Sequence, residues 1–168
     1  MSEEIVDIVN EHNIVIKQCA RSKMRKERLL HRASYIIIKN HQDYYYIQKR
    51  TQLKDYCPSM LDACCGGVMT AGESPDLSAL RELEEEMGIK DTPLTFHGWF
   101  FHRDGEANVW GAVYSCIYDG PLILQASEVE SVSLMLLDEI FAREKEFTPD
   151  SIAAIRFWLE KRRNIGSV

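Results

Sequence analysis

The chain has 168 residues, of which 45% are hydrophobic and 27% are charged, and this fits one globular domain with a single core rather than a disordered chain. The net charge of −6 argues against a broad nucleic-acid-binding surface, although a bound cation could still make a site attractive to a small phosphorylated substrate. The five cysteines show no CxxC spacing, so the sequence predicts neither a disulfide framework nor a zinc site. No signal peptide and no apolar run of membrane-spanning length is visible, so we expect a cytoplasmic protein.

Residues 1–30 are expected to form an N-terminal extension built on a β-hairpin. β-branched runs at 5–9 and 14–16 flank the turn-forming residues 10–13. The basic stretch 21–28 that follows is predicted to be a solvated short helix or loop.

Residues 31–165 are expected to form the main domain, in which short strands are interrupted by two longer helices. Strands are predicted at 35–38, 44–50, 63–69, 94–101, 109–117 and 131–137, with a short helical segment at 138–143. Helices are predicted near 75–87 and 149–162. This pattern indicates an α/β fold, an α/β/α sandwich around a mixed β-sheet.

The most informative segment is residues 67–89, GVMTAGESPDLSALRELEEEMGI. Ser74 can cap the backbone N–H groups of a helix, and Pro75 suits its first position. Gly88 can end the helix in a left-handed conformation. An apolar stripe is expected to face the core, made of Leu77, Leu80, Leu83 and Met87.

Three carboxylates of this helix, Glu82, Glu85 and Glu86, fall within an arc of about 100° that lies nearly opposite the stripe. Because like charges on one face repel each other, a cation is expected there, and oxygen ligands favour Mg²⁺ or Mn²⁺. Gly66 and Gly67 allow close approach to the backbone, so the Gly66 carbonyl is a plausible further ligand.

The segment resembles the Nudix box, G-x5-E-x7-R-E-U-x-E-E-x-G-U, where U is aliphatic. The matching residues are Gly67, Glu73, Arg81, Glu82, Leu83, Glu85, Glu86, Gly88 and Ile89. The resemblance implies a Nudix hydrolase that cleaves a diphosphate bond in a nucleoside-diphosphate-linked or similar small substrate. It also implies metal ligands at Glu82, Glu85, Glu86 and the Gly66 carbonyl, and structural roles for Gly67, Glu73, Arg81 and Gly88.

The general base stays open at this point. It is either Glu82 within the box or a carboxylate from a later segment, for which Asp104, Glu106 and Glu128 are candidates. Glu128 is favoured because it directly precedes a predicted strand. Homodimers are common among Nudix hydrolases, and the N-terminal hairpin is a candidate contact.

Two alternatives remain open. The chain is similar to the YfcD-like subgroup, which resembles type I isopentenyl-diphosphate isomerases, and Cys65 and His31 stand where such an isomerase has its catalytic cysteine and a metal-binding histidine. However, Gly67 replaces a further histidine, and residues 107–110 lack the isomerase glutamates. The simpler interpretation is that Cys65 is a small buried strand residue and that His31 is a hydrogen-bonded or exposed histidine next to Arg32. The second alternative is a non-catalytic sensor that uses the same pocket.

Overall fold

The computed structural model describes residues 3–166. Its strands are β1 (Ile5–Val9), β2 (Val15–Ala20), β3 (His31–Lys39), β4 (Tyr45–Arg50), β5 (Leu61–Asp62), β6 (Thr95–Arg103), β7 (Asn108–Ile117) and β8 (Val129–Met135). Its helices are α1 (Arg21–Glu27), α2 (Pro75–Met87), α3 (Leu137–Ala142), the 3₁₀ turn η1 (Glu144–Glu146) and α4 (Pro149–Gly166).

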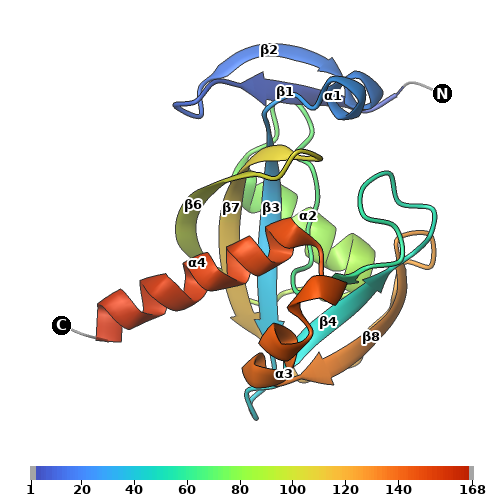
Figure 1. The fold of residues 1–168 in the computed structure, drawn as a ribbon. Helices are drawn as coiled ribbons and strands as arrows, with labels where there is room; N and C mark the ends of the chain where they lie inside the picture. Colours follow the sequence, from blue (N-terminus) through green and yellow to red (C-terminus); the bar gives the residue numbers. More distant parts are fainter. Residues whose placement is uncertain (1–2, 167–168) are drawn as a thin grey trace.

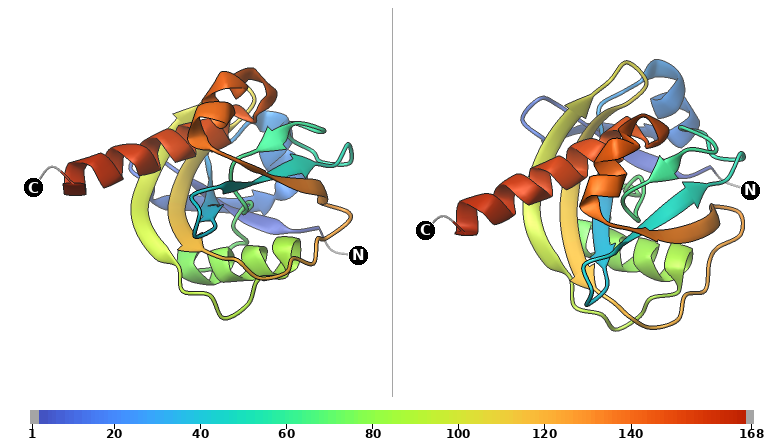
Figure 2. Two further views of the ribbon diagram at one scale, coloured as in Figure 1. Left: turned by 90° about the horizontal axis from the view of Figure 1, so that it is seen from below. Right: turned by 60° about the horizontal axis from the view of Figure 1, so that its bottom comes forward.

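The strands form one mixed sheet with β3 near its centre. β3 runs parallel to β7 and antiparallel to β4, while β6 pairs with β7 and β8 with β4. Helix α2 covers one face of this sheet and α4 the other (Figures 1 and 2). The predicted α/β/α sandwich is therefore confirmed.

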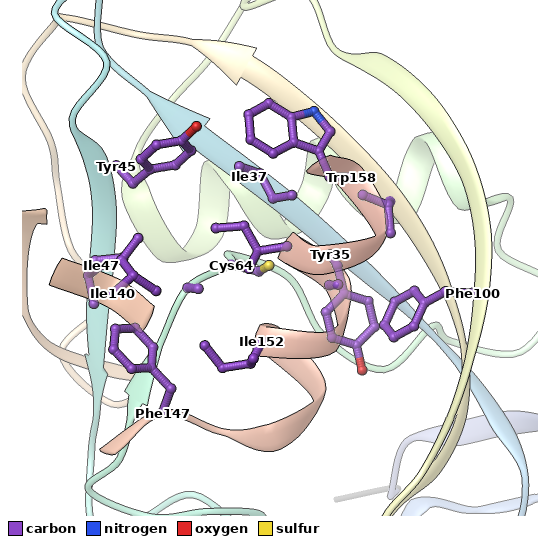
Figure 3. Close-up of a cluster of buried hydrophobic side chains, with 14 of the residues drawn as sticks. Tyr35, Ile37, Tyr45, Ile47, Cys64, Phe100, Ile140, Phe147, Ile152 and Trp158 are labelled. Carbon is purple, nitrogen blue, oxygen red and sulfur yellow. The ribbon is translucent and has the colours of Figure 1, made fainter. Parts of the chain in front are cut away.

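Alternate residues of β3 serve two separate cores, as expected for a strand covered on both faces. Tyr35 and Ile37 pack with α4 in a cluster that includes Ile152 and Trp158 (Figure 3). Ile36 and Ile38 pack on the other face with Ala79, Leu83 and Met87 of α2. The side chains of β3 thus anchor both helices to the sheet.

Helix α2 begins and ends where the sequence predicted. Ser74 Oγ accepts a hydrogen bond from Leu77 N at 3.2 Å, and Gly88 adopts a φ of 69°. The predicted apolar stripe, however, is wrong at two positions, since Leu77 is 62% exposed and Leu80 is 46% exposed. Small side chains allow α2 to approach β3 closely along a different row, where Ser78 Oγ lies 3.4 Å from Ser34 Oγ.

Because a different face of α2 packs on the sheet than the sequence predicted, the expected position of the carboxylates is also wrong. The buried face of α2 contains Ala79, Leu83 and Met87, and Glu86 is buried with them at 4% exposure. The acidic arc therefore does not lie opposite the packed face. It adjoins that face, so that Glu86 lies within it under Gly66 while the Glu85 side chain stays 46% exposed.

The strand predicted at 63–69 is also wrong. Only isolated bridges form there, between Cys65 and Ile36 and between Val68 and Ala33. Gly66 interrupts the ladder with a φ of 143°, and a Cβ on it would lie 2.0 Å from the carbonyl oxygen of Ser34. Only glycine allows so close an approach of this loop to β3.

The N-terminal hairpin is present and continues the same sheet, because β1 pairs with β2 and, through Ile8 and His31, with β3. Helix α1 is not merely solvated, since Met24 is 1% exposed and packs on Val6 and Val68. The division at residue 30 and a dimer through the hairpin stay predictions. Among the described residues, no helix is long and apolar enough to cross a membrane.

Candidate active site

An open cleft of about 560 Å³ lies beside the carboxyl-terminal half of α2. Its wall includes three of the box carboxylates, Glu82, Glu85 and Glu86, together with Glu128 from the connection before β8. The loop 51–60 between β4 and β5, Gly66–Gly67 and part of the N-terminal extension complete it. The fold thus brings the four predicted catalytic carboxylates to one surface.

Glu86 is the most buried of these carboxylates. Its Oε1 accepts hydrogen bonds from Gly66 N and Gln48 Nε2, both at 3.3 Å, and from the Cys65 thiol at 3.4 Å. Burial, together with the nearby charge of Glu82, raises the pKa of Glu86 to about 8. Such a group holds a proton at neutral pH unless a cation replaces it.

Glu82 stands beside it and is also largely buried, with 12% of its side chain exposed. Burial raises the pKa of Glu82, and the neighbouring Glu85 adds to this effect while Arg81 opposes it. A Cβ on Gly67 would lie 3.1 Å from the Glu82 carboxylate, so this glycine leaves room directly above it.

Arg81 organises the entrance to the box. Its guanidinium forms a two-pronged ion pair with Glu73, at 2.7 and 2.9 Å, and also donates to Glu82 at 3.0 Å and Glu85 at 3.1 Å. Glu73 in turn accepts from Thr70 N at 3.2 Å. Side-chain hydrogen bonding to Arg81 lowers the pKa of Glu73. The loop before α2 is therefore attached to the helix.

The three later carboxylates are separated by the fold. Glu128 lines the cleft and forms an ion pair with Lys54. Asp104 instead accepts hydrogen bonds from Tyr56 Oη at 3.0 Å and from backbone N–H groups of its own loop. Glu106 is exposed in that loop. Only Glu128 of these three faces the box.

Cys65 and His31 line a second, smaller chamber of about 50 Å³ behind Gly66–Gly67. Burial lowers the pKa of His31 to about 4 and raises that of the Cys65 thiol, so both groups are neutral at pH 7. His31 Nδ1 lies 3.0 Å from the Leu29 carbonyl oxygen. Among the described residues that line the chamber, His31 is the only imidazole, which does not match an isomerase metal cage.

Sequence reasoning missed the cations of the cleft. Lys54 and Arg21 line it from the loop 51–60 and from α1. The signal for Arg21 was the basic stretch 21–28, which was predicted to be solvated. Its partners lie in distant segments, so spacing within the stretch carried no sign of them.

The donor set of the cleft suits a hard divalent cation, because it consists of partly desolvated carboxylates with a carbonyl beside them. Within residues 3–166, no three acidic, histidine or cysteine side chains stand together as a ready-made metal cage. Arg81 pairs with Glu82 and Glu85, and Lys54 pairs with Glu128. The chain's own cations thus pair with three of the four carboxylates, whereas the hydrogen-bond donors to Glu86 are neutral groups.

Comparison with known proteins decides the family. Residues 29–156 match the model of the NUDIX domain. The chain is 48% identical over 160 residues to the uncharacterized Nudix hydrolase YfcD of Salmonella typhi, covering 95% of this chain and 87% of that protein. The chain belongs to the Nudix hydrolase family. As a Nudix hydrolase it is an enzyme that acts on pyrophosphate bonds of small substrates, a reaction that generally needs divalent metal ions.

Other relatives agree with this assignment. The uncharacterized Nudix hydrolase PA4841 of Pseudomonas aeruginosa is 35% identical over 161 residues, which is 94% of each chain. The crystal structure of DR0079 from Deinococcus radiodurans superposes with a TM-score of 0.75 at 24% identity, covering 84% of this chain and 89% of the other. At this identity the second likeness supports the fold alone.

Proposed function

We propose that this Nudix hydrolase uses Mg²⁺ or Mn²⁺ to cleave the diphosphate linkage of a nucleoside-diphosphate-linked or similar small substrate. The observation that carries the proposal is the set of four carboxylates on one cleft, with Glu86 almost fully buried. A buried acid with a raised pKa and an acidic neighbour is a typical feature of functional sites.

The residues that would hold the cation are Glu82, Glu85, Glu86 and the carbonyl of Gly66. The neighbouring carbonyls of Cys65 and Gly67 accept hydrogen bonds from Ile36 N and Ser34 N. Among the described residues, none of the hydrogen bonds uses the Gly66 carbonyl. It is therefore available as an oxygen ligand. When bound, the cation would neutralise the diphosphate and lower the pKa of an attacking water.

Glu128 is proposed as the general base. Its carboxylate faces the cleft from the connection before β8, and its ion pair with Lys54 orients it there. In this role it takes the proton of the attacking water. Lys54 and Arg81 also reduce the repulsion between the acidic wall and an anionic substrate.

The structural roles proposed for four box residues follow from their contacts. Glu73 and Arg81 join the loop to α2. Gly67 leaves space above Glu82, and a Cβ on Gly88 would lie 2.8 Å from Ile123 Cβ. Gly88 therefore allows a close approach that a side chain would obstruct, and a side chain at Gly67 would have to push the Glu82 carboxylate aside.

The test measures cleavage of a panel of nucleoside diphosphates, nucleotide sugars and isoprenoid diphosphates with Mg²⁺ or Mn²⁺, by chromatography of the phosphorylated products. The panel includes ADP-ribose, since a similar fold, the NUDIX domain of NrtR from Shewanella oneidensis, was crystallised with it at 14% identity and a TM-score of 0.62, covering 85% of this chain and 99% of that one. Turnover should need the metal and fall by about 10²-fold or more in Glu86→Gln.

Glu84→Gln is the matched control, because Glu84 lies on the same helix with its side chain 56% exposed and pairs with Lys90. Equal turnover of wild type and Glu86→Gln would refute the role of Glu86. Ligand-induced thermal stabilisation without turnover on any substrate would favour the sensor alternative.

A further inference from the structure

Arg21, the first residue of α1, lies outside the residues that match the NUDIX domain and yet lines the catalytic cleft. Its Nε and Nη2 bind the two carboxylate oxygens of Asp55 at 3.1 and 3.4 Å. Its Nη1 binds Glu4 Oε2 at 3.2 Å. Only 26% of the side chain is exposed, so these contacts are partly shielded from water.

On one side, Arg21 connects to the Nudix box. Glu4 uses its other oxygen, Oε1, to accept a hydrogen bond from Thr70 Oγ1 at 3.1 Å. Thr70 N donates to Glu73, which is paired with Arg81 of α2. A continuous set of polar contacts therefore runs from Arg21 to the helix that carries the catalytic carboxylates.

On the other side, Arg21 connects to the loop 51–60. Asp55 is the centre of this contact, and Arg25 of α1 also reaches it at 3.4 Å. The preceding residue, Lys54, pairs with Glu128. The loop thus presents Lys54 to the cleft while Asp55 faces the N-terminal extension.

The position of residues 54 and 55, in the middle of this loop, depends on their ion pairs. Thr51 at its start donates to the carbonyls of Ser127 and Glu128, and Arg50 donates to the Tyr56 and Cys57 carbonyls nearer its end. The contacts that tie residues 54 and 55 to other elements are the ion pairs of Lys54 with Glu128 and of Asp55 with α1. Although burial opposes it, hydrogen bonding to Arg21 and the charge of Arg25 lower the pKa of Asp55 to about 2. Asp55 therefore stays charged at neutral pH.

We propose that Arg21 is a positioning residue that clamps the loop 51–60 to the Nudix box loop and thereby sets the width of the substrate cleft. The N-terminal extension is then part of the active site rather than an appendage to it. The substrate effect rests on the function proposed above, while the mechanical link between the two loops does not.

The test compares Arg21→Met, Arg21→Lys, Asp55→Asn and the double variant Arg21→Met/Asp55→Asn in the full chain. Loss of the clamp should lower kcat/KM by about tenfold or more, mainly through KM, because the diphosphate is no longer held against a fixed wall. Arg21→Lys should recover part of the loss. The double variant should lose less than the sum of the two single losses, expressed as free energies, since both single variants remove the shared Arg21–Asp55 contact.

Mn²⁺ affinity without substrate, measured by titration calorimetry, should stay within about twofold of wild type, because the α2 carboxylates are untouched. Arg103→Met is the matched control. Arg103 pairs with Glu11 at 3.2 Å and also joins the extension to the main domain, but the two side chains are 53% and 66% exposed and do not line the cleft. This variant should keep the wild-type KM.

Hydrogen exchange of residues 51–60 gives a readout that needs no substrate. Exchange should become faster in Arg21→Met and Asp55→Asn and stay unchanged in Arg103→Met. Unchanged exchange in both clamp variants would overturn the clamp. A wild-type kcat/KM in both clamp variants would also overturn it. The same holds if the loss of kcat/KM in the double variant equals the product of the two single losses. Wild-type protein without turnover would refute the proposed hydrolase, but the exchange rates would still decide the clamp.

Discussion

The burial of Glu86 leads to a quantitative prediction for the metal-free protein. The pKa of this acid is about 8 in the folded state against a usual value of 4.5. Since the folded pKa is raised, the stabilisation is fully present below the unfolded pKa and is lost as pH rises through about 8. One pH unit in that window corresponds to about 1.4 kcal/mol, so unfolding free energy should fall by roughly 2–3 kcal/mol between pH 6 and 8.

Glu86→Gln should remove this dependence, because a glutamine of nearly the same shape never ionises. It retains a carbonyl oxygen for the hydrogen bonds from Gly66 N and Gln48 Nε2. Urea unfolding in a chelator, from pH 5.5 to 8.5, measures both proteins. At pH 8 the variant should be more stable than wild type, which is an unusual outcome for a substitution at a buried position.

Added Mn²⁺ should reverse the order of stability at pH 8, so that wild type becomes more stable than Glu86→Gln. A cation replaces the proton on Glu86, so it should stabilise wild type most at high pH and the variant much less. Glu84→Gln, on the exposed side of α2, should follow wild type in both conditions. Parallel pH profiles for wild type and Glu86→Gln without metal would show that Glu86 is not desolvated as described, and would refute the reasoning.

Three further predictions concern single residues. Gly66→Ala should lose about 3 kcal/mol or more in chemical denaturation, because its Cβ would meet the Ser34 carbonyl oxygen at 2.0 Å; a loss below about 1 kcal/mol would contradict this contact. Leu83→Ala should cost about 2–5 kcal/mol and Leu77→Ala less than about 0.5 kcal/mol, since they are 1% and 62% exposed; equal losses would show that the helix faces are misassigned. Glu128→Gln should lower kcat by about 10²–10⁴-fold while Mn²⁺ affinity in calorimetry is unchanged; loss of Mn²⁺ binding would make it a ligand instead of the base.

The sequence alone determined the features that depend on near neighbours in the chain. The helix of the Nudix box could be placed residue by residue, because Ser74 and Gly88 act on backbone groups within one turn of themselves. The spacing of Glu82, Glu85 and Glu86 placed them on one arc for the same reason. The N-terminal hairpin followed from two β-branched runs around a turn in which Asn10 Oδ1 accepts from the backbone.

Tertiary structure decided which face of α2 is buried. Periodicity favoured Leu77 and Leu80, but the helix turns Ala79 and Ser78 to the sheet, since small residues permit closer packing on β3. Glu86 is buried as a consequence. Hydrophobicity alone cannot predict that leucines of this helix are exposed and a glutamate is buried. Which residues are buried depends on the surface of the sheet as well as on the helix.

Tertiary structure also decided which charges meet. Glu128 lies 74 residues from Lys54, and Arg21 lies 34 residues from Asp55, so no local spacing indicates either pair. Their contact depends on the order and register of the strands that carry them. The sequence therefore determined the family and its acidic helix, whereas the cations that shape the cleft were set by the three-dimensional arrangement of distant loops.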